Sequence, residues 1–96
     1  MGEMATVVHH NPDRSRYELL VDGRVAGVAD YRLGDDVIVF PHTEIVAQLR
    51  GRGLGAVLVQ GALDDVRDAG RRVVPACWYV ARFIDEHEEY QALLAA

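Results

Sequence analysis

The feature that most constrains the fold is a stretch in which Arg and Gly alternate, Arg50-Gly51-Arg52-Gly53-Leu54-Gly55-Ala56. It follows an apolar run that ends at Ile45-Val46-Ala47, and it leads into an apolar pattern with helical spacing. Three glycines at alternate positions allow a tight turn and leave room for a ligand at the backbone, because they carry no Cβ. This order of segments predicts a strand, a glycine loop and a helix.

The glycine loop also predicts a site for a phosphate group. No Ser, Thr, Asp or Asn stands before the helix as a capping residue, so its first N–H groups lack a side-chain partner. The helix dipole places roughly half a positive charge at this end, and Arg50 and Arg52 add two forked guanidinium groups. A tight turn with solvated arginines is the simpler alternative, but the combination of features favours anion binding.

Three apolar segments before the loop are typical of strands: Tyr17 to Val21, Arg24 to Leu33 and Val37 to Val46. Asp22-Gly23 is a hairpin dipeptide and Gly34-Asp35-Asp36 a second turn, so the three strands form an antiparallel meander.

The third of these segments is nearly all apolar, which predicts a central strand covered on both faces. Pro41 lacks an N–H group and therefore predicts a bulge or bend within it. Residues 1–16 are expected to form a loose or edge element, and residues 1–96 to form a single domain.

After the loop, Gly53 to Ala69 has helical periodicity, with Gly70 as the expected C′ residue. One apolar stripe of this helix comprises Leu54, Leu58, Ala62, Val66 and Ala69, and Gly61 indicates close packing on the sheet or on a ligand. Arg72 to Cys77 then predicts a strand parallel to the third strand, because it is reached by a helical crossover. One or two short helices, Val80 to Glu86 and Glu89 to Ala95, close the chain.

Composition limits the classes of partner. The net charge of −5 disfavours a general nucleic-acid or membrane-surface binder, and all ten basic residues are Arg, which excludes a P-loop lysine. Cys77 is the one cysteine, and no basic leader or long apolar segment is present, so we expect a cytoplasmic protein.

The motif Arg50-x-x-Gly53-x-Gly55 at a strand-to-helix junction resembles the pyrophosphate loop of the GNAT superfamily of acetyl-CoA-dependent N-acetyltransferases. The resemblance implies that the preceding strand end pairs with the pantetheine of coenzyme A and that the next strand splays away to open a cleft. Ala47 stands where that loop usually has Pro. The cofactor-binding residues implied are Ile45, Val46, Ala47, Arg50, Gly51, Arg52, Gly53, Leu54, Gly55 and Ala56.

Three further motifs resemble the minimal YjdJ-type subgroup of that superfamily. They are His42-Thr43 before the loop, Cys77-Trp78-Tyr79-Val80 after the last strand, and His87-Glu88-Glu89-Tyr90, where Glu88 replaces the usual Pro. The resemblance covers about Tyr17 to Tyr90 and implies a GNAT-like α/β fold: a meander, then a strand–helix–strand unit with a splayed parallel pair, then short helices.

The candidates for chemistry are Cys77, Tyr79 and His42. Cys77 follows the parallel strand at the rim that carries the loop, where a thiol could take an acetyl group or simply line the cleft. Tyr79 could protonate the leaving thiolate, as a Tyr often does in the superfamily, and His42 could deprotonate an amine. Each is equally or better explained as a packed residue, and Glu44 is an alternative base.

The resemblance implies transfer of acetyl from acetyl-CoA to an amine, in a small molecule or a protein, directly or through Cys77. A coenzyme A binding module with little turnover and an interaction domain without ligand are the alternatives. A Rossmann-type dinucleotide site is rejected, because Val73 to Ala76 supplies no acidic residue. The spacing of His and Cys predicts no structural metal.

Overall fold

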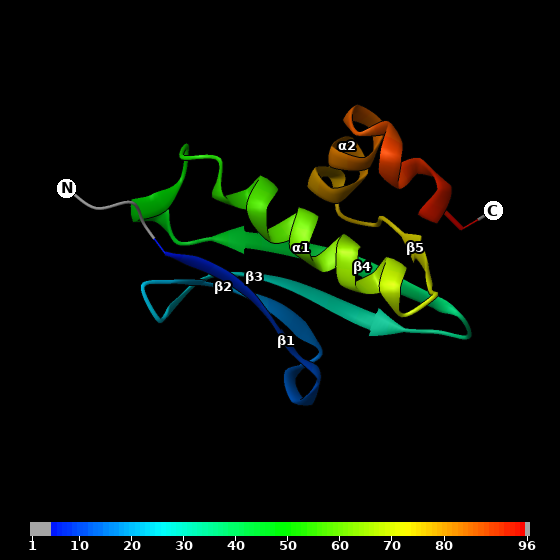
Figure 1. The fold of residues 1–96 in the computed structure, drawn as a ribbon, viewed down its shortest axis with the longest axis horizontal. Helices are drawn as coiled ribbons and strands as arrows, with labels where there is room; N and C mark the ends of the chain where they lie inside the picture. Colours follow the sequence, from blue (N-terminus) through cyan, green and yellow to red (C-terminus); the bar gives the residue numbers. More distant parts are fainter. Residues whose placement is uncertain (1–4, 96) are drawn as a thin grey trace.

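The sheet has five strands, which lie side by side in chain order in the computed structural model of residues 5–95. β1 to β4 pair antiparallel and β5 pairs parallel to β4, as the meander and the crossover predict (Figure 1). The predicted edge element is strand β1, whereas residues 1–4 lie outside the described residues. The strands are β1 (Thr6–Asn11), β2 (Arg16–Val21), β3 (Arg24–Leu33), β4 (Val37–Ile45) and β5 (Arg72–Val74).

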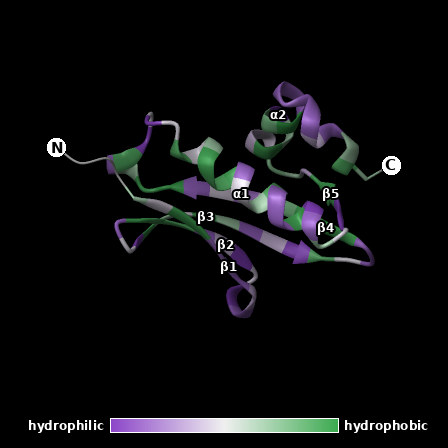
Figure 2. Cartoon of the chain, viewed as in Figure 1, coloured by the Kyte–Doolittle hydropathy of each residue, from purple (hydrophilic) through white to green (hydrophobic). Residues whose placement is uncertain are grey.

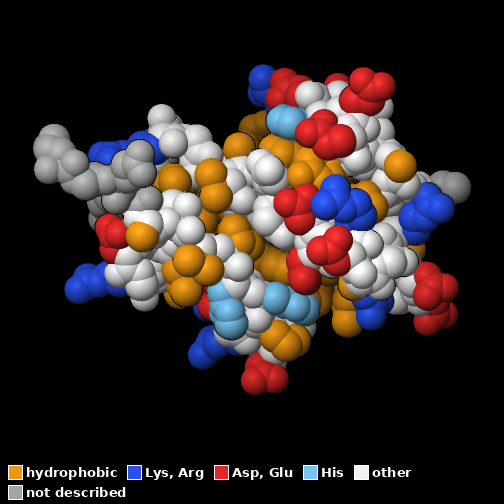
Figure 3. Space-filling model, viewed as in Figure 1, with side chains coloured by type: hydrophobic (Ala, Val, Ile, Leu, Met, Phe, Trp, Pro, Cys, Tyr) orange, Lys and Arg blue, Asp and Glu red, His pale blue; other side chains and the backbone are white. Residues whose placement is uncertain are grey.

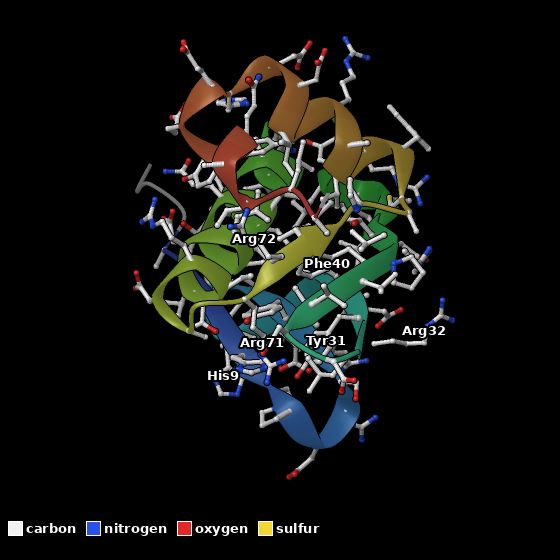
Figure 4. The ribbon with its side chains drawn as sticks, turned by 90° about the vertical axis from the view of Figure 1, so that its right-hand side faces the viewer. His9, Tyr31, Arg32, Phe40, Arg71 and Arg72 are labelled. Atoms are coloured by element: carbon white, nitrogen blue, oxygen red, sulfur yellow. The ribbon has the colours of Figure 1, made fainter. Side chains whose placement is uncertain are left out.

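Two α-helices cover one face of the sheet, α1 (Leu54–Asp68) between β4 and β5 and α2 (Trp78–Glu86) after β5 (Figure 1). Three 3-10 helices complete the chain: η1 (Pro12–Arg14), η2 (Ala47–Leu49) and η3 (Glu88–Leu93). The short helix expected at Glu89 to Ala95 is the 3-10 helix η3, which ends at Leu93 and is followed by a bridge between Leu94 and Val73. Figure 4 shows Arg72 beside this segment, where its guanidinium donates to the Ala92 carbonyl over 3.0 Å.

The turns form as their residues predict. Asp22 and Gly23 both have positive φ, 50° and 84°, which suits the twist of a two-residue hairpin. Gly70 ends α1 with φ of 74°, as a C′ glycine does.

The core lies between α1, α2 and the facing side of the sheet. Figure 4 shows Phe40 of β4 between the sheet and the helical layer, and Figure 2 shows the polar stretches at the β1–β2 connection and near the C-terminus. Of the predicted helical stripe, Leu54, Leu58, Ala62 and Val66 are buried, but Ala69 lies after the last turn and is exposed. Gly61 packs against β1, since a Cβ there would lie 2.6 Å from a methyl carbon of Val8.

Strand β4 has the predicted irregularity at Pro41. On β3, Asp30 and Arg32 are separated by one residue, whereas their β4 partners His42 and Val39 are separated by Phe40 and Pro41. The extra residue reverses the alternation of the side chains along the rest of β4. Thr43 and Ile45 therefore share the face of Ile38 and Phe40, whereas His42 and Glu44 point to the opposite face.

The expectation that β4 is covered on both faces is wrong. Ile38 and Phe40 are buried, but Val37 and Val39 between them are only half-buried, because both α-helices lie on the other side of the sheet. β4 is nevertheless internal, since it pairs with β3 on one edge and with β5 on the other.

Strands β4 and β5 separate after three residue pairs. Val37 to Val39 pair with Arg72 to Val74, and the Cys77 N–H then donates to the Phe40 carbonyl over 2.7 Å. β5 is thus shorter than the expected Arg72 to Cys77, because Pro75 cannot donate to the ladder. From Pro41 onward, β4 has no β5 partner on that edge.

Two buried tyrosines join α1 to the layers around it. The Tyr17 hydroxyl of β2 donates to Asp65 over 2.5 Å, and the Tyr90 hydroxyl of η3 donates to Asp64 over 2.7 Å. Burial and the Asp65 carboxylate hold the pKa of Tyr17 well above its usual value. Burial, followed by the bond to Asp64, raises the pKa of Tyr90 from 10.0 to about 12. Both hydroxyls therefore stay protonated when the chain is folded.

We predict that alkaline pH destabilises the fold partly through Tyr90. Between pH 10.0 and about 12 the folded chain keeps the Tyr90 proton and the unfolded chain releases it, so the free energy of unfolding falls as pH rises. The slope from one tyrosine is at most about 1.4 kcal/mol per pH unit. Urea denaturation at several alkaline pH values should give a shallower decline for Tyr90→Phe than for wild type. Equal slopes would contradict the assignment.

Candidate functional site

A cleft of about 440 Å³ opens where β4 and β5 separate. Its walls come from the end of β4, from the glycine loop with the start of α1, and from the start of α2. The chain thus brings together three segments that the sequence analysis singled out. The lining residues are Thr43, Glu44, Ile45, Leu49, Arg50, Gly51, Gly53, Leu54, Gly55, Cys77, Trp78 and Tyr79.

The glycine loop owes its path to two left-handed residues. Gly51 and Gly53 have φ of 80° and 76°, and no other atom lies within 4 Å of where their Cβ would be. Gly53 is the N-cap of α1 and supplies no side-chain capping bond, as the sequence predicts. The N–H groups at the start of α1 are therefore available to an anion.

The positive charge near the loop is not neutralised by neighbours. Within residues 5–95, Arg50 and Arg52 form no ion pair with a carboxylate. The Arg50 Nε–H donates to the Ile45 carbonyl over 3.0 Å, which holds the guanidinium beside the end of β4. In the view of Figure 3, most carboxylates gather over the C-terminal half of α1 and the C-terminal helices instead.

The third glycine of the loop has a different role from the other two. Gly55 lies within α1, and a Cβ there would be 2.7 Å from the Tyr79 hydroxyl oxygen. Tyr79 therefore packs directly on the first turn of α1, where burial raises its pKa above the ordinary value of 10.0. Gly55 joins the loop to α2 rather than shaping the turn.

The free edge of β4 offers backbone groups to the cleft. The Val46 N–H donates to Ala26 on β3 over 2.8 Å, and Glu44 pairs with Val28. Because such bonds alternate along an antiparallel pair, the N–H and C=O groups of Thr43 and Ile45 point away from β3, toward the side that β5 has left. An extended ligand could pair with this edge.

Thr43 also carries an unsatisfied polar atom. Its Oγ1 is buried and has no hydrogen-bond partner, the one such side-chain atom among the described residues. Buried hydroxyls normally have a hydrogen-bond partner, so Thr43 is an exception among the described residues.

Cys77 lines the cleft at the N-terminus of α2 rather than at the end of a strand. It is the N-cap residue of α2, its backbone N–H is bound to Phe40, and its side chain is partly buried.

The predicted base His42 lies apart from Cys77 and Tyr79. Both His42 and Glu44 are more than half exposed on the sheet face opposite the helices, and His42 Nε2 lies 3.1 Å from Glu44 Oε1. Glu44 lines the cleft and His42 does not. Of the predicted cofactor-binding residues, Val46, Ala47, Arg52 and Ala56 also lie outside the cleft lining.

The sequence analysis gave no role to two cleft residues, Thr43 and Leu49. Thr43 was noted only within the subgroup motifs. Pro41 was the feature of the sequence that could have identified Thr43. It indicates a bulge, and the bulge reverses the alternation of side chains on β4, so that Thr43 faces the cleft. Leu49 lies in η2, which no pattern in the sequence predicts.

Among residues 5–95, no three His, Cys, Asp or Glu side chains come together as a metal site. None of the helices in this part of the chain is long and apolar enough to cross a bilayer.

The fold and the cleft define an α/β domain with a glycine-rich strand–loop–helix segment beside a splayed parallel strand pair. The model of the GCN5-related N-acetyl-transferase family matches residues 16–93. The chain therefore belongs to this family and is an acetyltransferase.

Comparison with solved structures agrees on the fold. The solution structure of a GCN5-like protein from Staphylococcus aureus matches with a TM-score of 0.70 and 16% identity, over 94% of this chain and 88% of that one. No curated protein matches the chain.

We predict that Gly53→Ala lowers the free energy of unfolding by about 1 kcal/mol, because Ala strains a left-handed backbone. Gly53→Asn should cost less, since Asn adopts this conformation more readily. Urea denaturation measures both variants. Equal stability of wild type and Gly53→Ala would show that the loop does not hold this conformation in solution.

Proposed function

We propose that the chain transfers the acetyl group of acetyl-CoA to an amine. The observation that carries the proposal is the cleft itself, in which an anion-binding loop, an open strand edge and a thiol face one space. The pyrophosphate would bind the N–H groups at the start of α1 together with Arg50. The pantetheine would pair with the free edge of β4 at Thr43 and Ile45, and the unpartnered Thr43 hydroxyl would bind one of its polar groups.

Two routes of acetyl transfer fit these residues. In the direct route, a neutral amine attacks the thioester carbonyl, a C–N bond forms, and the C–S bond breaks. The amine gives up its proton to Glu44, which lines the cleft and contacts His42, and the departing thiolate takes a proton from Tyr79.

In the second route, Cys77 carries the acetyl group between donor and acceptor. Its thiolate attacks the thioester carbonyl, the C–S bond to the coenzyme breaks, and the coenzyme leaves as a thiolate. The amine then attacks the new thioester, gives up its proton to Glu44, and releases the Cys77 thiolate as the C–N bond replaces the C–S bond. The place of Cys77 at the positive end of α2 supports this route.

The subgroup assignment and the acceptor also belong to the proposal. Thr43 and Cys77-Trp78-Tyr79 of the YjdJ-type motifs line the same cleft, although His42 does not, and this supports that subgroup. The exposed position of His42 and Glu44 on the outer sheet face indicates that the amine approaches from that side. The chain would then work in the cytoplasm, where acetyl-CoA is available.

We predict that acetyl-CoA stabilises the fold. A ligand at about 100 times its Kd adds about 2.7 kcal/mol, which raises the Tm of a domain of this size by about 4–8 °C. Gly53→Asp should abolish the rise, because its carboxylate repels the phosphates, whereas the isosteric and neutral Gly53→Asn should keep most of it. No rise with wild type would overturn the proposal and leave an interaction domain. A rise without acetyl transfer to any amine would leave a coenzyme-binding module.

We predict that incubation with acetyl-CoA adds one acetyl group to wild type and none to Cys77→Ser. Intact-mass spectrometry measures the adduct, and the thermal shift of Cys77→Ser should equal that of wild type, because the thiol takes no part in holding the phosphates. An adduct that persists in Cys77→Ser would exclude the cysteine route. Amine acetylation at the wild-type rate by Cys77→Ser would assign the direct route instead.

A further inference from the structure

We infer that a second cavity, between the first turn of α1 and α2, binds the adenosine 3′-phosphate end of coenzyme A, with the adenine on Trp78 and the 3′-phosphate on Arg82. The inference rests on the proposed function and adds how the enzyme would distinguish coenzyme A from shorter pantetheine thioesters.

The second cavity adjoins the cleft. Its volume is about 200 Å³, too small for a whole ligand of coenzyme size but sufficient for one part of it. It shares Trp78 and Tyr79 with the cleft, and its α1 wall is Ala56, the residue after Gly55. A ligand whose phosphates bind the start of α1 can therefore extend into either space.

The spacing along α2 arranges the second cavity. Trp78, Arg82 and Glu86 recur every four residues and form its outer rim, while Tyr79, Phe83 and His87 form the adjacent inner row. Cys77 lines the cleft but not this cavity. In the proposed function the thioester lies near Cys77 and Thr43, in the cleft. The second cavity is therefore placed to bind the adenosine end of the coenzyme, and not the acceptor.

The walls of the cavity are aromatic. The rings of Phe83 and His87 are stacked, with centroids 3.9 Å apart and planes 14° from parallel. His87 Nδ1 lies 2.6 Å from the Phe83 carbonyl oxygen, a hydrogen bond that fixes the imidazole in place. Trp78 is 70% exposed, the most exposed of the large apolar side chains in the described part of the chain. Exposed aromatic rings of this kind stack on the flat faces of nucleobases.

Arg82 is the positively charged residue of the rim and therefore the group that would bind a phosphate. Its Nε lies 3.3 Å from Glu86 Oε2, and the two side chains are 66% and 54% exposed. An exposed pair of this kind contributes little stability, so a phosphate can replace the carboxylate as the partner of Arg82. Glu86 then opposes the phosphate by its own charge. The two residues must therefore have opposite effects on affinity for the 3′-phosphate.

The experiment compares coenzyme A with 3′-dephospho-coenzyme A on the full chain. Trp78 is the one tryptophan of the sequence, so its fluorescence reports ligand stacking directly, and calorimetry gives the Kd. Wild type should bind coenzyme A about three- to fivefold more tightly than the dephospho form. This ratio should fall to one in Arg82→Ala and rise in Glu86→Gln. Arg14→Ala, which removes an Arg from the distant β1–β2 connection, should leave the ratio unchanged.

The adenine contact is tested separately with Trp78→Leu. This variant should bind both coenzymes about tenfold more weakly by calorimetry, because a stacked base is lost, and should keep the wild-type ratio between them. Adenosine 3′,5′-bisphosphate, which lacks pantetheine, should quench the Trp78 fluorescence of wild type.

The outcomes separate this inference from the proposed function. Wild type that binds both coenzymes with equal affinity, or variants of Arg82 and Trp78 that bind like wild type, would overturn the inference and leave the proposed function standing. Wild type that binds neither coenzyme would overturn both.

Discussion

The functional site depends on the point at which β4 and β5 stop pairing. Two prolines set that point, because Pro41 on β4 and Pro75 after β5 have no N–H to donate. The last bond between the two segments runs from Cys77 to Phe40, directly before the divergence. The same bond fixes Cys77 at the start of α2, so the interaction that ends the sheet also places the thiol. The cleft, its open strand edge and its candidate nucleophile have one structural cause.

Much of the fold was predictable because local chemistry dictates it. Asp22-Gly23 and Gly70 adopt the positive φ values that their turns require, and β3 has the predicted bounds, Arg24–Leu33. Element bounds were less predictable where tertiary contacts decide. The short helix expected at Glu89 to Ala95 ends at Leu93, because the chain then returns to β5 through the bridge at Leu94.

The candidate site was predictable in part. The loop could be identified because glycine, arginine and the missing cap all indicate an anion, whichever way the rest of the sheet packs. The sequence could not predict which side chains of β4 face the cleft. If the side chains kept alternating after Ile38 and Phe40, His42 and Glu44 would point inward. The bulge reverses this phase and gives the inward position to Thr43. A proline signals that a bulge is present but not how many residues it displaces.

The three glycines show how the loop and α2 act as one unit. Gly51 and Gly53 supply only backbone freedom, since nothing lies near where their Cβ atoms would be. Gly55 instead leaves the space in which the Tyr79 hydroxyl packs against the first turn of α1. Tyr79 follows Cys77 by two residues. A displacement of the loop must therefore move Tyr79 or open a gap beneath it. The proposed anion binding at the start of α1 would thus be coupled by direct contact to the helix that carries the candidate residue Tyr79.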